Sequence, residues 1–173
     1  MSKVQRRGPG VAALTGFMQR INGARVVVGI QGSEGAWKYP PQRLGGPARP
    51  LSLVEVASVH EFGTEDGHVP ARSFLRLTLK KKSSAYLSAL RKALADGAGA
   101  VPQGEAAAVN ALSTAFERVG LRVTRDVQAT IRDGGPGWPA LSPRTVAAKG
   151  STSPLIDTGQ LRQSIRHAVR GLR

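Results

Sequence analysis

The clearest pattern of apolar and polar positions in the chain lies between residues 105 and 132. Apolar side chains recur there at separations of three and four residues, at Val109, Leu112, Phe116, Val119, Val123, Val127 and Ile131. This spacing places them on one face of an α-helix. We therefore expect one long amphipathic helix at about 105–132.

Two shorter helices are predicted nearer the N-terminus. Residues 11–21 carry apolar side chains three and four positions apart, and an Asn-Gly pair follows them. Ser52 and Glu55 have the spacing of a capping box, in which each residue bonds the other's backbone N–H. This second helix should end near Phe62, because Gly63 follows and readily leaves helical geometry.

Residues 72–94 show a longer helical pattern. Asp96-Gly97 is expected to end it, and a break near Ser83-Ser84 is one alternative. Part of residues 72–79 could instead form a strand. The helical reading puts five side chains on one face, Leu75, Leu79, Tyr86, Leu90 and Leu94.

Two segments are predicted as strands. Residues 25–31, RVVVGIQ, are short and β-branched, which is typical of a buried strand. After Gly159 we expect a short helix that passes into a final strand, with Ile165, His167 and Val169 on one face. A helix with arginines four residues apart is the competing reading of this end of the chain.

The mixture of helices and few strands predicts an α+β fold, a small antiparallel sheet packed with several helices. Residues 11–173 are expected to form a single domain, preceded by a disordered or extended arm at 1–10. Residues 32–50 are rich in glycine and proline and should form a long loop at the surface or at a subunit contact.

The stretch from Trp138 to Ile165 contains two helix-start signals. Ser142 is a predicted N-cap with Pro143 at the first helical position, and Gly150 should end that helix. Asp157 could accept the free N–H groups of the next turn. We expect several apolar side chains of this stretch to pack against the long helix, namely Trp138, Leu141, Leu155 and Ile156.

The charge of the chain indicates a polyanionic partner. Of its 173 residues 25 are Lys or Arg and 11 are Asp or Glu, giving a net charge of +14. A generally basic composition would produce the same surplus without any partner. A second stripe on the long helix, Arg118, Arg122 and Arg125, is either a solvated face or a surface for DNA or an acidic subunit. Further basic candidates are Lys80, Lys81 and Lys82.

Composition also narrows the class of protein. The chain has no cysteine, so disulfides and thiolate metal sites are excluded. No apolar run approaches the roughly 20 residues that a membrane helix needs, and no apolar signal core follows the basic N-terminus. Aromatic residues make up only 5%, which argues against a stacking platform for single-stranded nucleic acid.

The sequence contains two partial matches to catalytic motifs, and both are incomplete. Asp157-Thr158-Gly159 resembles the aspartic-protease signature, but too little chain follows it to build the required barrel. His60-Glu61 begins like a zinc-protease motif, yet position 64 is threonine and not the second histidine. We find no nucleophile paired with a base, and we expect neither enzymatic activity nor a metal or cofactor.

A stand-alone nucleic-acid-binding protein is the alternative that the charge keeps open. The sequence contains no zinc finger, ribonucleoprotein motif or basic zipper. A helix-turn-helix over residues 142–165 fails because Pro154 lies between the two helices and the second is too short. This alternative therefore rests on charge alone.

Two ordered patterns resemble the tail-completion, or virion-morphogenesis, proteins of tailed bacteriophages. The first motif is VASVHEFGT at 56–64 followed by VPARSFLR at 69–76, and similar runs occur in phage neck proteins. The second motif is WPALSPRTVAAKG at 138–150 with PLIDTGQLRQSI at 154–165, similar to the closing segment in Mu-like phages. The VVVGI strand precedes both, as in those families.

The resemblance implies a non-enzymatic virion component with an α+β fold at the head–tail junction. Such proteins form homo-oligomeric rings, commonly sixfold, assembled in the host cytoplasm. The implied neighbours are the head–tail connector, the tail tube or tail terminator, and the packaged DNA. Lysines and arginines that line a DNA channel would lower the cost of passing a phosphate backbone, without reading its sequence.

Within these motifs we expect structural roles. Glu61 should receive a hydrogen bond or an arginine partner, Gly63 should permit a backbone turn, and Pro70 should restrict the next one. The full set of candidate structural residues is His60, Glu61, Gly63, Pro70, Arg72, Phe74, Trp138, Asp157 and Gly159. The loop 149–153 is a candidate for subunit or partner contact.

Overall fold

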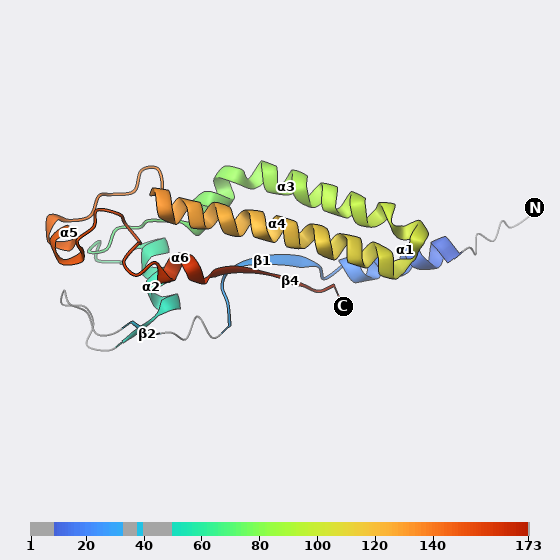
Figure 1. Ribbon diagram of the computed structural model, residues 1–173, viewed down its shortest axis with the longest axis horizontal. Coiled ribbons are helices and arrows are strands. Elements are labelled where there is room, and N and C mark those ends of the chain that lie inside the picture. Colours follow the sequence, from blue (N-terminus) through green and yellow to red (C-terminus); the bar gives the residue numbers. More distant parts are fainter. Residues whose placement is uncertain (1–8, 33–37, 40–49, 173) are drawn as a thin grey trace, which may run out of the picture. The chain divides into compact units, whose positions relative to one another are not determined.

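The computed structural model describes residues 9–32, 38–39 and 50–172 of the chain. Its α-helices are α1 (Pro9–Ile21), α2 (Leu53–Phe62), α3 (Leu75–Gly99), α4 (Glu105–Asp133), α5 (Pro143–Lys149) and α6 (Gln160–Ser164). A short 3-10 helix, η2 (Val101–Gln103), joins α3 to α4, and the strands are β1 (Arg25–Ile30), β2 (Lys38–Tyr39), β3 (Leu51–Ser52) and β4 (Ile165–Arg170) (Figure 1).

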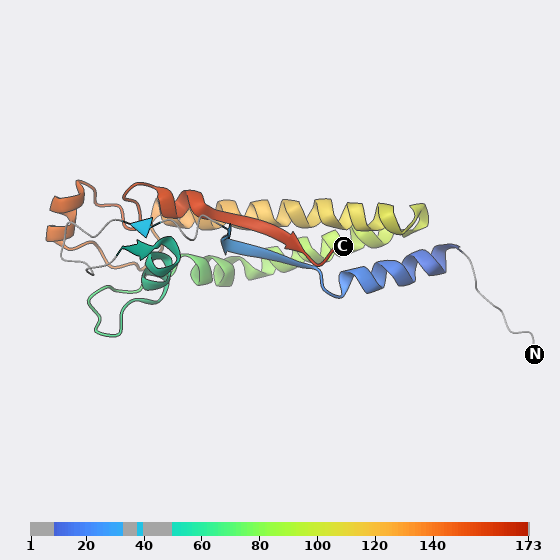
Figure 2. The same cartoon turned by 90° about the horizontal axis from the view of Figure 1, so that it is seen from below.

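The strands form two small sheets. β1 lies beside β4, and the two run in opposite directions (Figure 2). β2 pairs antiparallel with β3, with Lys38 opposite Ser52 and Tyr39 opposite Leu51. Helices dominate the rest of the described chain, so the predicted α+β class is confirmed. No helix in the described ranges is long and apolar enough to cross a membrane.

The chain divides into two compact units that interleave along the sequence. Unit 1 takes in the described residues of Met1–Val27, Ser83–Arg122 and His167–Arg173. Unit 2 takes in those of Val28–Lys82 and Val123–Arg166. The boundaries fall inside α3 and α4, and a single domain over residues 11–173 stays a prediction.

In unit 1 the core forms where α1, α3 and α4 meet. Its buried side chains are Phe17, Ala93, Val101, Ala108, Leu112 and Phe116. A Cβ at Gly97 would lie 3.0 Å from the Phe17 ring and 3.1 Å from Leu112 Cβ. The missing side chain therefore lets the end of α3 approach both neighbours closely.

In unit 2 the core surrounds the beginning of α3 and the end of α4. Fully or nearly fully buried side chains include Leu53, Phe74, Val123, Val127, Ile131, Leu161 and Ile165. Polar contacts join the two long helices, since Thr78 and Thr130 share a hydrogen bond of 2.7 Å. The amide of Gln128 donates to the carbonyl of Ile165 at 3.2 Å, which connects α4 to the start of β4.

Several predicted elements are confirmed. α4 covers Glu105–Asp133, and its predicted apolar face is buried except at the half-buried Val109. α2 begins with the expected capping box between Ser52 and Glu55. The strand predicted at 25–31 is β1, although its residues are half-buried or exposed and not buried as expected. The end of the chain is a short helix passing into a strand.

The prediction for α3 is wrong in its boundaries and its buried face. The helix runs unbroken through Ser83-Ser84 and continues past Asp96-Gly97 to Gly99, and no strand forms at 75–79. Leu79 and Leu94 are 38% and 40% exposed. Tyr86 of the predicted face is buried, and the other buried positions on this helix are Thr78, Ala93 and Gly97. Smaller side chains occupy much of this face because α1 and α4 pack closely there, as at Gly97.

The N-terminal predictions are corrected in part. Pro9 and Gly10 belong to α1 and not to an extended arm, while residues 1–8 lie outside the described residues. The face predicted for 11–21 is split, because Phe17 is buried but Val11, Leu14 and Met18 are about half exposed. Within the predicted loop 32–50, Lys38–Tyr39 form β2, and residues 33–37 and 40–49 lie outside the described residues.

The unit 1 core gives a direct test of this packing. Leu112 is fully buried, so Leu112→Ala should lower the free energy of unfolding by about 3 kcal/mol through lost burial and a residual cavity. Leu87 on α3 is 53% exposed, and Leu87→Ala should change it by less than about 0.5 kcal/mol. Urea denaturation measures both. Equal effects of the two substitutions would contradict the described core.

Candidate functional site

The carboxylate of Glu61 lies at the beginning of α3 and caps it. Its two oxygens accept the backbone N–H groups of Phe74 and Leu75 at 2.9 Å and of Arg76 at 3.0 Å. The hydroxyl of Ser73 donates to it at 2.6 Å. An anion at this position satisfies N–H groups that have no partner within the helix, and it favourably meets the helix dipole.

Arg76 fixes the same carboxylate from the side. Its Nε donates to Glu61 Oε1 at 3.0 Å, and its Nη2 donates to the Glu61 carbonyl at 3.0 Å. The guanidinium also lies over the Phe62 ring, 4.4 Å from its centre. Burial opposes the charge on Glu61, but the hydrogen bonds from Ser73, Leu75 and Arg76 outweigh it, so the pKa of Glu61 lies below its usual value.

Gly63 makes the turn that brings the two halves of the first motif together. Its φ is +79°, and a Cβ there would lie 3.0 Å from the Val69 oxygen and the Ala71 nitrogen. The N–H of Thr64 donates to the Val69 carbonyl at 3.0 Å. Only glycine fits both the backbone angle and the space, which confirms the expected turn. Pro70, which was predicted to restrict the next turn, is half-buried.

Arg72 joins the first motif to the second. Its backbone N–H donates to the His60 carbonyl at 2.7 Å. Its guanidinium donates to the Pro139 carbonyl at 3.1 and 3.0 Å and to the Ala140 carbonyl at 3.2 Å. The residue is only 5% exposed, and burial lowers the pKa of Arg72 from its usual value. Phe74, two residues later, is 3% exposed and anchors the start of α3 in the unit 2 core.

His60 is held in the neutral state beside these cations. Burial, followed by the charges of Arg72 and Lys149, lowers the pKa of His60 to about 4. Its Nδ1 is buried and has no hydrogen-bond partner among the described residues. A neutral imidazole is the form that this position accommodates, because a charged one would face two like charges.

Trp138 of the second motif lies against a glycine. A Cβ at Gly135 would collide with the Trp138 indole. The backbone N–H of Trp138 donates to the Gly135 carbonyl at 3.1 Å. The indole Nε1 is buried without a partner among the described residues. Trp138 is half-buried, as are Leu141, Leu155 and Ile156, and the predicted packing of these side chains on α4 stays a prediction.

The remainder of the second motif confirms one helix-start prediction and corrects another. Ser142 Oγ accepts the Thr145 N–H at 3.2 Å, Pro143 opens α5, and Gly150 ends it in left-handed geometry. Asp157 does not cap α6. Gly159 occupies the N-cap with a φ of 76°, and Thr158 Oγ1 receives the Gln160 N–H at 3.4 Å.

The reason for this correction is the chain path before α6. The helix begins at Gln160, so Asp157 lies two residues before the N-cap and remains exposed. Its carboxylate acts instead on Lys149 of α5. Burial lowers the pKa of Lys149, Asp157 opposes that shift, and Arg72 adds to it. Lys149 Nζ also donates to the Ser153 carbonyl at 2.6 Å, which closes the loop 149–153 on itself.

The predicted basic residues differ in their exposure. Arg118, Arg122 and Arg125 are all exposed on one face of α4, and Lys80 and Lys81 are exposed on α3. Lys82 is half-buried and forms an ion pair of 2.5 Å with Asp126. Lys82 therefore connects α3 to α4 within unit 2, and its predicted role in a channel or at an interface stays a prediction.

The described residues offer little for catalysis. They contain no group of three His, Asp or Glu side chains arranged to hold a metal ion. Glu61, the most buried carboxylate of the motifs, already accepts five hydrogen bonds. A carboxylate with that many donors stays ionised and is a poor proton carrier.

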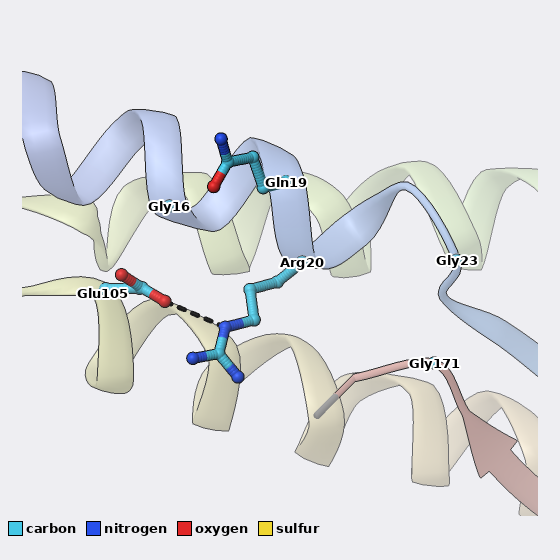
Figure 3. A pocket seen from close by; sticks show the side chains of 6 residues that line it. All are labelled: Gly16, Gln19, Arg20, Gly23, Glu105 and Gly171. Carbon is cyan, nitrogen blue, oxygen red and sulfur yellow. Dashed lines mark hydrogen bonds and ion pairs between the residues drawn. The ribbon is translucent and has the colours of Figure 1, made fainter.

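The described residues form two surface hollows, one in each unit. In unit 1 an open hollow of about 430 Å³ is lined by Gly16, Gln19, Arg20, Gly23, Glu105 and Gly171 (Figure 3). Its charged groups, Arg20 and Glu105, pair with each other at 2.9 Å. In unit 2 a hollow of about 220 Å³ lies over the Lys82–Asp126 pair and Thr130. Neither brings together groups suited to a reaction.

Comparison with protein-family models, with curated proteins and with solved structures gave no match to this chain.

Sequence reasoning missed the partners of the motif residues. Ser73 and Arg76 complete the Glu61 cap, and Phe62 receives the Arg76 guanidinium. One signal was present, because Ser73 lies just before an apolar-periodic segment, as an N-cap residue does. No local signal pairs Arg72 with carbonyls 67 and 68 residues away.

The Glu61 cap predicts a large cost for a small change. Glu61→Gln keeps the shape but replaces one accepting oxygen by an N–H₂ group that faces N–H donors. We expect the free energy of unfolding to fall by about 3 kcal/mol, measured by urea denaturation. Glu65→Gln, on an exposed turn four residues later, is the matched control and should change it by less than about 0.5 kcal/mol.

His60 predicts a dependence of stability on pH. Its pKa is about 4 in the folded chain and about 6.5 when unfolded, so between these values the unfolded chain binds more protons. The free energy of unfolding should fall by about 3 kcal/mol as the pH falls from 7 to 4 through this group alone. His60→Gln should remove that slope, measured by urea denaturation across pH, whereas the exposed His68→Gln should retain it.

Proposed function

We propose that this chain is a structural virion protein of a tailed phage, a tail-completion or neck protein that forms a ring joining the tail to the head. The observation that carries the proposal is the contact between its two motifs. Arg72 of the first motif donates to the Pro139 and Ala140 carbonyls of the second. The two patterns that resemble the phage family thus belong to one structural unit.

The use of the polar motif residues supports a non-catalytic role. Glu61 caps α3, and the Arg72 guanidinium binds carbonyls. Asp157, the residue of the protease-like triplet, is exposed beside the neighbouring cation Lys149. These side chains hold segments of the chain together, which is what a ring component requires.

The exposed cations support a place beside packaged DNA. Lys80 and Lys81 on α3 and the arginines of α4 present positive charge to solvent. In a ring on the tail axis such side chains lower the cost of bringing a phosphate backbone through the channel. The ring would be a homo-oligomer, with sixfold symmetry as in the family it resembles, between the connector and the tail tube or tail terminator.

Imaging of particles tests this proposal. We expect a reconstruction of the virion to place the chain as a ring at the neck, and particles made without the chain to accumulate as separate heads and tails. Supplying the chain in trans should restore joined particles. A virion in which density at the neck and the head-proximal tail is fully accounted for by other proteins would contradict the proposal.

A stand-alone nucleic-acid-binding protein is the second candidate, favoured by the exposed stripe Arg118, Arg122 and Arg125. It predicts a monomer by mass photometry that binds duplex DNA with a steep dependence on salt. Replacing the three arginines by Gln should then reduce the salt slope by about one per lost phosphate contact. Thermal unfolding should change little, because all three side chains are exposed.

A further inference from the structure

We propose that neighbouring copies of this chain contact each other through two different surfaces. The Phe62 surface consists of Val54 and Phe62 on α2 and of Glu65 and Asp66 on the turn that follows. The Leu121 surface consists of Arg118, Leu121 and Arg122 on α4. The inference rests on the proposed ring and names the contact between its subunits.

The Phe62 surface presents a large aromatic side chain that is already held in place. Phe62 is 63% exposed, and Val54, two turns earlier on the same face of α2, is 47% exposed. The Arg76 guanidinium lies 4.4 Å from the Phe62 ring centre and is itself bonded to the buried Glu61. An exposed aromatic ring held this way loses little conformational freedom on binding, as is typical of an interface anchor.

Negative charge follows that ring closely in the sequence. Glu65 and Asp66 follow Phe62 within four residues on an exposed turn. The N–H of Gly67 donates to the Thr64 carbonyl at 3.0 Å, and the N–H of His68 donates to Asp66 Oδ1 at 3.0 Å, so the turn has a defined shape.

These two carboxylates differ from most others in the described chain, which form ion pairs with cations of the same chain. The pairs are Glu61–Arg76, Asp96–Lys92, Glu105–Arg20, Asp126–Lys82 and Asp133–Arg132. Glu65 and Asp66 have no ion pair within the described residues. They therefore leave negative charge exposed on a protein whose net charge is +14.

The Leu121 surface has the opposite charge around a similar apolar centre. Leu121 is 44% exposed, and Arg118 and Arg122 lie three residues before it and one after it, both exposed. Leu121 lies one turn after Arg118 on α4, so an aromatic ring can pack on this aliphatic side chain while the two carboxylates meet the neighbouring arginines. Arginine and carboxylate can pair through two parallel hydrogen bonds, which also sets the orientation of the contact.

Charge complementarity identifies the occupant as a second copy of this chain. Two molecules of charge +14 repel each other, so self-association requires a contact in which local negative charge meets local positive charge. The Phe62 surface supplies the first and the Leu121 surface the second. DNA does not fit the Phe62 surface, because Glu65 and Asp66 would repel its phosphates.

The difference between the two surfaces determines the kind of assembly. A contact between two unlike surfaces leaves one of each unused on the end subunits, so it repeats from copy to copy, and it gives a ring where the rotation between neighbours closes. This assigns Arg118 and Arg122 to the subunit contact. Lys80, Lys81 and Arg125 remain exposed for the channel.

Charge reversal of each surface tests the contact in the full-length chain. One variant carries Glu65→Lys and Asp66→Lys, and the other carries Arg118→Glu and Arg122→Glu. Each variant alone should associate at least tenfold more weakly than wild type by mass photometry and sedimentation velocity. An equal mixture should restore assembly, because each reversed surface then meets the other and each native surface meets its native partner.

Further variants separate this contact from general charge effects. Phe62→Ala should also weaken assembly, whereas the exposed pair Lys81→Glu and Arg91→Glu, which changes charge by the same amount elsewhere, should leave it intact. All variants should keep the circular dichroism spectrum of wild type, since the changed side chains lie at the surface. Their thermal unfolding should match that of wild type at a concentration too low for assembly, because assembly itself raises the unfolding temperature.

The proposed contact would be overturned by a wild-type chain that stays monomeric at high concentration, by reversed variants that assemble normally, or by a mixture that fails to restore assembly. If Arg118→Glu and Arg122→Glu changed DNA binding alone, the Leu121 surface would be assigned to DNA instead.

The proposed function is tested separately. If the reversed variants assemble normally and the chain is present at the neck, the contact is refuted and the function stands. If the chain is absent from the neck, the function is refuted whatever the assembly result.

Discussion

The buried carboxylate of Glu61 is the interaction on which the architecture of unit 2 depends. It ends one helix and begins another, because its oxygens accept three consecutive backbone N–H groups at the start of α3. A buried charge is costly unless hydrogen bonds surround it, and here five donors do so. The same carboxylate fixes Arg76, which in turn holds Phe62 in an exposed position. A single anion therefore connects the folding of the first motif to the surface that the motif presents.

The buried guanidinium of Arg72 is a cation that binds backbone carbonyls. It is buried without a carboxylate partner among the described residues and satisfies its donors with the Pro139 and Ala140 carbonyls. Those carbonyls lie in a segment without helix or strand, where backbone groups need partners from elsewhere. The consequence appears at His60, whose imidazole is kept neutral by burial and by the cations nearby. The two motifs thus support each other through backbone groups and cations.

The distribution of charge links this architecture to assembly. A strongly basic chain suits a channel for DNA, but it opposes contact between its own copies. Half of the described carboxylates pair with a lysine or arginine of the same chain, so the exposed acidic turn after Phe62 is the place that we propose for a basic neighbour. In the proposed ring, the channel would use exposed side chains of α3 and α4, and the subunit contact would use a separate set on α2, the turn after it and α4.

Sequence alone determined the features that depend on neighbours a few residues apart. The period of apolar side chains placed α4 and its buried face, and the Ser52–Glu55 and Ser142-Pro143 signals placed the starts of α2 and α5, because capping is local. Only the tertiary structure decided which carboxylate capped α3, since Glu61 reaches donors 12 to 15 residues away. It also decided that Gly97 and Ala93, and not Leu79 and Leu94, face the core, because close approach of Phe17 and Leu112 favours small side chains there. The pairing of Arg72 with a segment 67 residues distant has the same origin, because a carbonyl gives no sequence signal and is offered to a donor only by the folded chain.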